Sequence, residues 1–170
     1  MSVTLDIART YRAPRQVARR QMAGERREER ALVYLLGACL VIFMAQWPRL
    51  QREAVLNPDA PPLDAQIGGA LFAWMFLMPL VFYGIAAASH LVARLFGGRG
   101  TWYRARIALF WTLLAISPLM VLQGLVAGLV GPGPELAIVG GAVVLAFGAI
   151  WGISLAEAEW PRAAKGDEHA

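Results

Sequence analysis

Basic residues are confined to a few segments of this 170-residue chain, and that confinement restricts its fold more than any other feature. Of the 16 Lys and Arg residues, 8 fall within residues 1–30, and none falls within residues 53–93 or 107–161. An ionised side chain at the centre of a bilayer costs at least about 2.5 kcal/mol, so a membrane selects long runs without charge. Hydrophobic residues make up 58% of the chain, against roughly 45–50% in an ordinary soluble domain. The sequence therefore predicts an integral membrane protein.

Four apolar runs are each long enough to cross a bilayer as a helix: residues 31–47, 67–93, 107–131 and 136–156. A span needs about 17–25 mainly apolar residues, and none of these runs contains Asp, Glu, Lys or Arg. A polar segment precedes the first run and no small-residue cleavage site follows it, so we expect an uncleaved anchor rather than a signal peptide. The predicted fold is all-α, a bundle of four transmembrane helices with a tail over residues 157–170.

The distribution of basic residues predicts the orientation of the bundle. Four spans leave 14 basic residues on one side of the membrane and 2, Arg49 and Arg52 of the connection 48–66, on the other. The positive-inside rule places the richer side, with both termini, in the cytoplasm. The opposite side holds the proline-rich stretch 57–64 and the turn 131–134, neither of which resembles a folded domain.

The segment 1–30 combines an apolar spacing with dense positive charge. Val3, Ile7 and Tyr11 recur every four residues, which aligns them on one face of a helix. A basic amphipathic helix beside a membrane lies at the interface, with its arginines on anionic lipid headgroups. We therefore expect lipid rather than nucleic acid as the partner of the basic residues, and a docking site for a cytoplasmic protein remains an alternative.

A glycine-rich stretch joins the second and third predicted spans. Gly97, Gly98 and Gly100 permit the positive backbone angles that a tight reversal needs. The stretch lacks the Lys-Ser/Thr pair of a phosphate-binding loop and follows no strand, which argues against nucleotide binding. We expect a cytoplasmic hairpin whose basic residues contact lipid, namely Arg99, Arg104 and Arg106.

Prolines and glycines within the spans indicate how the helices bend and pack. Pro79 and Pro118 each remove a backbone donor, which predicts a kink near each and leaves a broken-helix binding site as the alternative. Two Gly-x-x-x-Gly pairs allow close approach of helix backbones, either within the monomer or in a homo-oligomer. They are Gly124 with Gly128 and Gly148 with Gly152.

The residues that could carry chemistry are few. Cys39, the single cysteine, lies in an apolar run and is expected to pack as a small hydrophobe. His90 is the one basic side chain inside a span, and His169 is the only other histidine. The sequence therefore predicts no catalytic, metal or cofactor site. An uncoupled channel or small permease near Pro79, Pro118 and Gln123 is the alternative, and an intramembrane enzyme that uses His90 is a weaker one.

Residues 89–111, Ser-His-Leu-Val-Ala-Arg-Leu-Phe-Gly-Gly-Arg-Gly-Thr-Trp-Tyr-Arg-Ala-Arg-Ile-Ala-Leu-Phe-Trp, followed by Ile116-Ser-Pro118, resemble the middle of bacterial members of the Yip (Ypt-interacting protein) family. The resemblance covers residues 70–125. It implies a polytopic membrane protein without established enzymatic activity, and eukaryotic relatives associate with Rab-type GTPases and with each other. This chain has four predicted spans rather than the usual five and lacks the acidic-Leu-Tyr-Gly-Pro motif, which argues against GTPase binding. We expect a bacterial inner-membrane protein that associates with lipid or with other membrane proteins.

Overall fold

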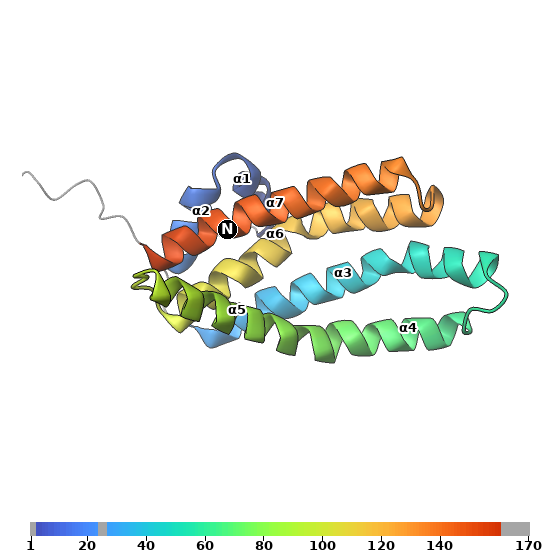
Figure 1. Ribbon diagram of the computed structural model, residues 1–170, viewed down its shortest axis with the longest axis horizontal. Helices are drawn as coiled ribbons and strands as arrows, with labels where there is room; N and C mark the ends of the chain where they lie inside the picture. Colours follow the sequence, from blue (N-terminus) through green and yellow to red (C-terminus); the bar gives the residue numbers. More distant parts are fainter. Residues whose placement is uncertain (1–2, 24–26, 161–170) are drawn as a thin grey trace, which may run out of the picture.

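The structure, a computed structural model, describes residues 3–23 and 27–160 (Figure 1). Residues 1–2 and 24–26 of the basic segment and residues 161–170 of the predicted tail lie outside the described part. A π-helical turn, η1, joins α4 to α5, so residues 63–95 form one continuous helix. The elements are α1 (Val3–Arg12), α2 (Pro14–Met22), α3 (Glu28–Leu56), α4 (Leu63–Phe72), η1 (Ala73–Leu77), α5 (Met78–Leu95), α6 (Trp102–Leu129) and α7 (Pro134–Glu159).

Four helices are long and apolar enough to cross a membrane: Glu28–Leu56, Leu63–Leu95, Trp102–Leu129 and Pro134–Glu159. Each overlaps one of the four predicted runs, so the prediction of an all-α bundle of four spans is confirmed.

The main difference from the predicted elements is at the end of the first span. There α3 continues through Pro48 to Leu56, whereas the sequence predicts a connection from residue 48 onward. The Arg52 side chain lies over the end of α6 and donates to the carbonyl oxygens of Gly128 and Leu129 at 3.3 and 3.5 Å. These carbonyls have no partner within α6, so the contact stabilises both helix ends.

The core of the bundle is built around α6, which packs against α3 on one side and α7 on the other (Figure 1). Its fully or almost fully buried side chains include Leu109, Phe110 and Trp111. Phe110 meets Tyr83 of α5 and Trp111 meets Tyr34 of α3 in edge-to-face contacts, with ring centroids 5.0 and 5.1 Å apart. The aromatic contacts thus join three of the four spans.

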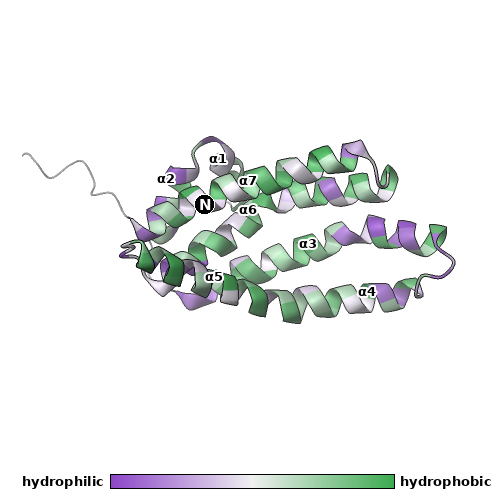
Figure 2. Cartoon of the chain, in the orientation of Figure 1, coloured by the Kyte–Doolittle hydropathy of each residue, from purple (hydrophilic) through white to green (hydrophobic). Residues whose placement is uncertain are grey.

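Hydrophobic residues predominate in the middle of the helices, and hydrophilic residues concentrate toward the two ends of the bundle (Figure 2). Phe76, Leu80 and Leu145 expose 68%, 71% and 75% of their surface. A continuous exposed apolar surface of this extent is unfavourable in water and favourable in hydrocarbon. The protein is therefore a multi-pass membrane protein.

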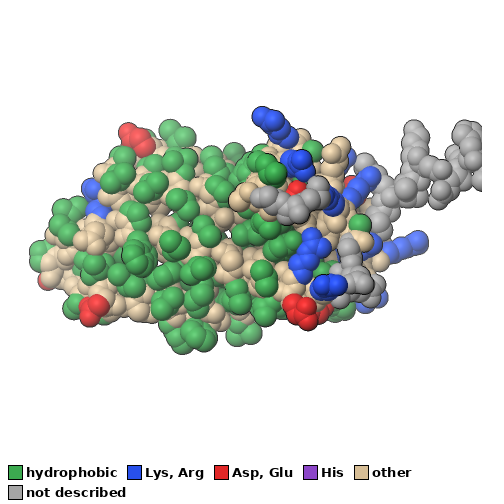
Figure 3. Space-filling view, turned by 180° about the vertical axis from the view of Figure 1, so that it is seen from behind, with side chains coloured by type: hydrophobic (Ala, Val, Ile, Leu, Met, Phe, Trp, Pro, Cys, Tyr) green, Lys and Arg blue, Asp and Glu red, His purple; other side chains and the backbone are tan. Residues whose placement is uncertain are grey.

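One end of the bundle is basic. It carries α1, α2, the α5–α6 turn and the C-terminal end of α7, while the α3–α4 and α6–α7 turns lie at the other end (Figure 1). Lys and Arg side chains gather at the first of these ends (Figure 3). The two described ends of the chain therefore lie on the same side of the four spans, as an even number of crossings requires.

The basic N-terminal segment forms two helices, and they pack on α6 and α7. The face that α1 turns toward the bundle is largely polar. Ile7 packs against the core, but Val3 and Tyr11 are exposed, whereas Asp6 and Thr10 are buried. Thr10 faces α6, where the Trp111 indole N–H donates to its hydroxyl, and Asp6 pairs with Arg9 and Arg20. The placement of the apolar face in the headgroup boundary stays a prediction.

Candidate functional site

The basic end of the bundle contains a buried pair of ionisable side chains. His90, near the end of α5, places its Nδ1 atom 2.6 Å from Oε1 of Glu159, the last residue of α7. The two side chains have exposures of 1% and 0%. The Trp102 ring covers the imidazole at a centroid distance of 4.5 Å. A buried carboxylate is stable only with a charged or hydrogen-bonding partner, and here each side chain provides the partner of the other.

The glycine-rich turn between α5 and α6 surrounds Glu159. The Gly100 N–H donates to Oε2 at 3.1 Å, and the Arg99 N–H donates to the main-chain carbonyl oxygen of Glu159 at 2.8 Å. The turn opens as a Schellman motif, in which the Gly98 N–H donates to the Ala93 carbonyl oxygen at 2.8 Å and Gly97 has a φ of +81°. The turn therefore ties the end of α5 and the start of α6 to the end of α7.

Of the three glycines in this turn, only Gly97 takes a positive φ, so the predicted reason for Gly98 and Gly100 is wrong. A methyl group at Gly98 would lie 2.9 Å from Oε2 of Glu159, and one at Gly100 would lie 2.6 Å from the same atom. Both distances are far inside the roughly 3.5 Å at which non-bonded atoms attract. These two glycines make room for a buried carboxylate.

A second carboxylate of α7 attaches the N-terminal helices to the bundle. Arg19 of α2 donates from Nε to Oε2 of Glu157 at 2.8 Å and from Nη2 to Oε1 at 3.2 Å. The Glu157 side chain is only 7% exposed, and the bidentate contact with Arg19 stabilises its carboxylate there. The hydrogen bond to Glu157, together with the attraction of its charge, raises the pKa of Arg19 above its ordinary value. The Arg19 guanidinium therefore stays charged at neutral pH.

Two hydroxyl groups fix α1 to α6. Thr10 is 1% exposed; its Oγ1 accepts from the Trp111 Nε1–H at 3.1 Å and donates to the Asp6 carbonyl oxygen at 2.8 Å. The Tyr11 hydroxyl donates to the Ala115 carbonyl oxygen at 2.7 Å, and burial raises the pKa of Tyr11. The N-terminal helices are thus part of the packed bundle at this end.

The arginines of the α5–α6 region differ in their partners. Arg106 donates to Oε1 of Glu28 at 2.7 Å, so the protein itself already engages this side chain, which the sequence assigned to lipid. Other basic residues around the turn form no ion pair with any described residue, namely Arg94, Arg99 and Arg104. Tyr103, at the start of α6, is buried, and its hydroxyl donates to the Arg27 carbonyl oxygen at 3.3 Å.

A family model described as the Yip1 domain matches residues 8–158. The chain belongs to the Yip1 domain family. This match confirms the family that the residues around the glycine-rich turn predict. No curated protein and no solved structure matches the chain.

The two prolines singled out in this Yip1-domain protein lie in different helical surroundings. Pro118 leaves the Leu114 carbonyl oxygen without its usual N–H partner, and the Ser117 hydroxyl donates to that oxygen at 2.8 Å. Pro79 lies two residues after the π-helical turn η1, which ends with a hydrogen bond from the Met78 N–H to the Ala73 carbonyl oxygen. The predicted kinks stay predictions, and only Pro118 has a side chain that serves the carbonyl oxygen left without a donor.

The two Gly-x-x-x-Gly pairs of the Yip1-domain bundle face different neighbours. A methyl group on Gly124 would clash with the Ala45 carbonyl oxygen, and one on Gly128 would clash with Pro48, so this pair lies in the contact between α3 and α6. A methyl group on Gly148 or Gly152 would meet nothing within 4 Å. The structure therefore uses the first pair inside the monomer and leaves the second on the open face of α7.

Gln123 lies in a small polar cavity away from both prolines. It lines a space of about 160 Å³ together with Gln46 and Arg49. Neither Pro79 nor Pro118 lines this cavity. The structure therefore does not gather the three residues named for a permeation path into one site.

Sequence reasoning missed Glu157 and Glu159, which it assigned to the tail. Two carboxylates that directly follow the last apolar run, on the same side of the membrane as His90, are the signal that could have indicated the buried pair. Cys39 is buried, as expected of a small hydrophobe. Within residues 3–23 and 27–160, no group of three or more His, Cys, Asp or Glu side chains is placed to hold a metal ion.

Proposed function

We propose that this Yip1-domain protein is a non-enzymatic protein of the bacterial inner membrane whose basic cytoplasmic end associates with anionic lipid headgroups and with other membrane proteins. The observation that carries the proposal is the set of arginines around the α5–α6 turn that form no ion pair with a described residue, namely Arg94, Arg99 and Arg104. The turn that carries them is held by Glu159. Each basic residue near an anionic bilayer contributes about 1 kcal/mol of attraction.

The burial of His90 and Glu159 supports a structural role for this pair. A general base must come within hydrogen-bond reach of the proton that it removes, and the exposures of 1% and 0% leave a substrate no access to either side chain. The neighbouring Ser89 hydroxyl donates to the Ala86 carbonyl oxygen at 2.9 Å. These contacts favour, over catalysis, a structural role in which the pair joins the end of α5, the start of α6 and the end of α7.

The proposed orientation is tested by labelling. We expect a reporter fused after Ala170 to be active in the cytoplasm, and a cysteine introduced at the exposed α3–α4 turn, Ala60→Cys, to react with a membrane-impermeant thiol reagent from outside. Cys39 is buried, and a Cys39→Ser background removes its signal. Labelling of Ala60→Cys only after the cells are broken open contradicts the orientation.

The proposed lipid association is tested by native mass spectrometry of the full chain purified in detergent. We expect phosphatidylglycerol to be retained in preference to phosphatidylcholine. Replacing Arg94, Arg99 and Arg104 together with Gln lowers the preference by at least about fivefold, the factor that corresponds to about 1 kcal/mol from a single arginine. Arg49→Gln, an exposed site in the half of α3 that leads away from the basic end, is the matched control. Equal retention of the two lipids by the unaltered chain contradicts the proposal.

An uncoupled channel or small permease is the second candidate, and the polar cavity around Gln123 favours it. Gln46 and Gln123 place partly exposed amide groups between α3 and α6, beside the exposed Arg49. If the cavity is part of a path, liposomes that contain the protein leak a solute selectively, and Gln123→Leu abolishes the leak. No leak above that of empty liposomes removes this candidate.

A further inference from the structure

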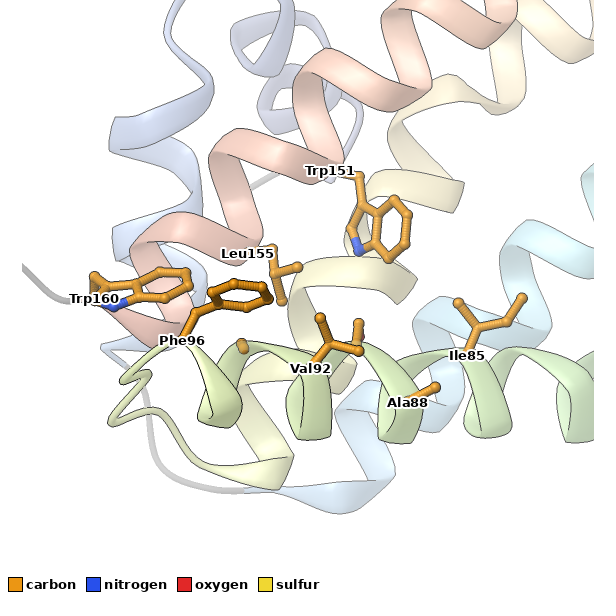
Figure 4. Close-up of a pocket in the computed structure, with 9 residues that line it drawn as sticks. Ile85, Ala88, Val92, Phe96, Trp151, Leu155 and Trp160 are labelled. Carbon is orange, nitrogen blue, oxygen red and sulfur yellow. The ribbon is translucent and has the colours of Figure 1, made fainter.

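An apolar groove lies between α5 and α7 at the basic end of the bundle, with a volume of about 470 Å³ (Figure 4). Its walls are bulky hydrocarbon and aromatic side chains, including Ile85, Val92 and Phe96 from α5 and Trp151 and Leu155 from α7. Its size falls within the roughly 300–1,000 Å³ of small-molecule sites. The groove therefore has the size and chemistry to hold one hydrocarbon chain.

The surface of the groove is almost entirely apolar, although the Trp151 Nε1–H in its wall is buried without a hydrogen-bond partner in the described part of the chain. Ser89 also lines the groove, but the hydroxyl donates to the Ala86 carbonyl oxygen at 2.9 Å. Val92 and Phe96 are 52% and 76% exposed, so the groove faces the surroundings of the bundle rather than its core. In a bilayer those surroundings are acyl chains.

The shape of the groove favours a flexible chain over a helix of another subunit. Close association of membrane helices needs small residues that let the backbones approach. The small residues that line the groove, Ala88, Ser89 and Ala93, stand beside bulky side chains such as Phe96, Trp151 and Leu155, which hold the backbone of a second helix away from them. The open small residues of α7, Gly148 and Gly152, are not among its lining residues. We expect a second copy of the chain, or another membrane protein, to bind instead at the face of α7 that carries Gly148 and Gly152.

Charge at the mouth of the groove selects the headgroup. Trp160 and Phe96 line its cytoplasmic end. The Arg99 main chain lies near this end, because its N–H donates to the carbonyl oxygen of Glu159, the residue before Trp160, at 2.8 Å. The Arg99 side chain is exposed and forms no ion pair within the described part of the chain. An uncompensated guanidinium at the same end of the bundle as an apolar groove is complementary to a phosphate that carries an acyl chain.

From this arrangement we infer that the groove is a binding site for an anionic phospholipid of the cytoplasmic leaflet, with one acyl chain between α5 and α7 and the phosphate on Arg99. The inference rests on the proposed function and adds a location and a stoichiometry of one lipid. The groove, rather than the basic surface as a whole, then determines how firmly that lipid is held.

A phosphatidylglycerol that carries a photoreactive diazirine in one acyl chain tests the site on the unaltered full-length protein. We expect crosslinks to concentrate in residues 85–96 and 151–160. A phosphatidylcholine with the same chain gives several-fold fewer crosslinks there, because it lacks the net negative charge. Crosslinks spread evenly over the exposed surface, including the outward-facing Ile138 and Leu145, overturn the inference. Occupation of the groove by a second copy of the chain in place of the lipid overturns it as well.

A pair of substitutions separates the groove from the charged surface. Ala88 and Ala149 are both exposed alanines of spanning helices, and only Ala88 lines the groove. We expect Ala88→Phe to lower phosphatidylglycerol retention several-fold and Ala149→Phe to leave it unchanged. If both variants retain phosphatidylglycerol equally and still prefer the anionic lipid, the groove is not the binding site, and the proposed function is unaffected. If the unaltered chain does not prefer phosphatidylglycerol to phosphatidylcholine, the proposed function itself is contradicted.

Discussion

At the residue scale, Glu159 holds the basic end of the bundle together. Its carboxylate contacts His90 and the Gly100 N–H, and both partners lose their hydrogen bond when it is removed. Removal of one member of a buried pair costs about 3–5 kcal/mol. We therefore expect Glu159→Ala to lower the free energy of unfolding in detergent by this amount, measured by thermal unfolding followed by the helical circular dichroism signal. Glu135→Ala, at an exposed carboxylate of the same helix, is the control, and equal stability of the two variants contradicts the prediction.

Gly100 provides a second prediction at this scale. A methyl group there would lie 2.6 Å from both the Ala158 carbonyl oxygen and Oε2 of Glu159. Forcing an extra carbon into a packed site costs about 1–3 kcal/mol, so we expect Gly100→Ala to lower the unfolding free energy by this amount. Gly148→Ala, where the methyl group meets nothing within 4 Å, leaves stability unchanged or raises it. The order of the two unfolding midpoints checks the prediction, and the reverse order contradicts it.

The same glycines show which part of a site a sequence can indicate. Three glycines between two apolar runs predict a tight turn, and the turn is there, because the need for a reversal is local. Gly98 and Gly100 both make room for Glu159, which lies far along the chain, and Gly98 also lies against the nearby Ala93 carbonyl oxygen. A contact of this kind depends on how helices are arranged in space, so neither the pairing with His90 nor the space that it needs is readable from the turn itself.

At the scale of one element, α6 crosses the membrane with a proline in its interior. The Ser117 hydroxyl serves the Leu114 carbonyl oxygen that Pro118 leaves without an N–H. We expect Ser117→Ala to cost about 1–3 kcal/mol in thermal unfolding, the penalty of a buried oxygen without a partner. In a Pro118→Ala background, which restores the N–H, the same substitution costs clearly less. A double-mutant cycle measures the difference, and equal costs in both backgrounds contradict this account of Ser117.

The bounds of the helices likewise depend partly on the local sequence and partly on contacts between residues far apart in the chain. The four spans are predicted correctly in number and approximate place, because exclusion of charge from hydrocarbon acts residue by residue. The extension of α3 past Pro48 was not predicted, and there Arg52 contacts the end of α6. The burial of Thr10 could not be predicted, because its partner Trp111 lies on α6, and apolar spacing does not reveal such a contact.

At the scale of the whole molecule, the two ends of the bundle are built differently. At the basic end, two N-terminal helices, the α5–α6 turn and the end of α7 are joined by side-chain contacts such as Arg19 with Glu157 and His90 with Glu159. At the other end, Arg52 reaches across from α3 to the end of α6. A rigid basic end with a lateral groove is suited to holding a lipid in a defined pose, because preorganised groups lose little freedom on binding.

The packing of the whole bundle distinguishes its two Gly-x-x-x-Gly pairs. Because Gly128 lies against Pro48 of α3, Gly128→Ile separates α3 from α6, and we expect the variant to lose several kcal/mol or fail to fold. Gly152 faces open space, so Gly152→Ile leaves the unfolding midpoint of the monomer unchanged. The mass of each variant in detergent, measured by light scattering, then reports on the open face of α7. A lower mass for Gly152→Ile than for the unaltered chain places an oligomer contact on that face. An unchanged mass means that the helix there contacts only lipid, and a destabilised Gly152→Ile monomer contradicts the packing described here.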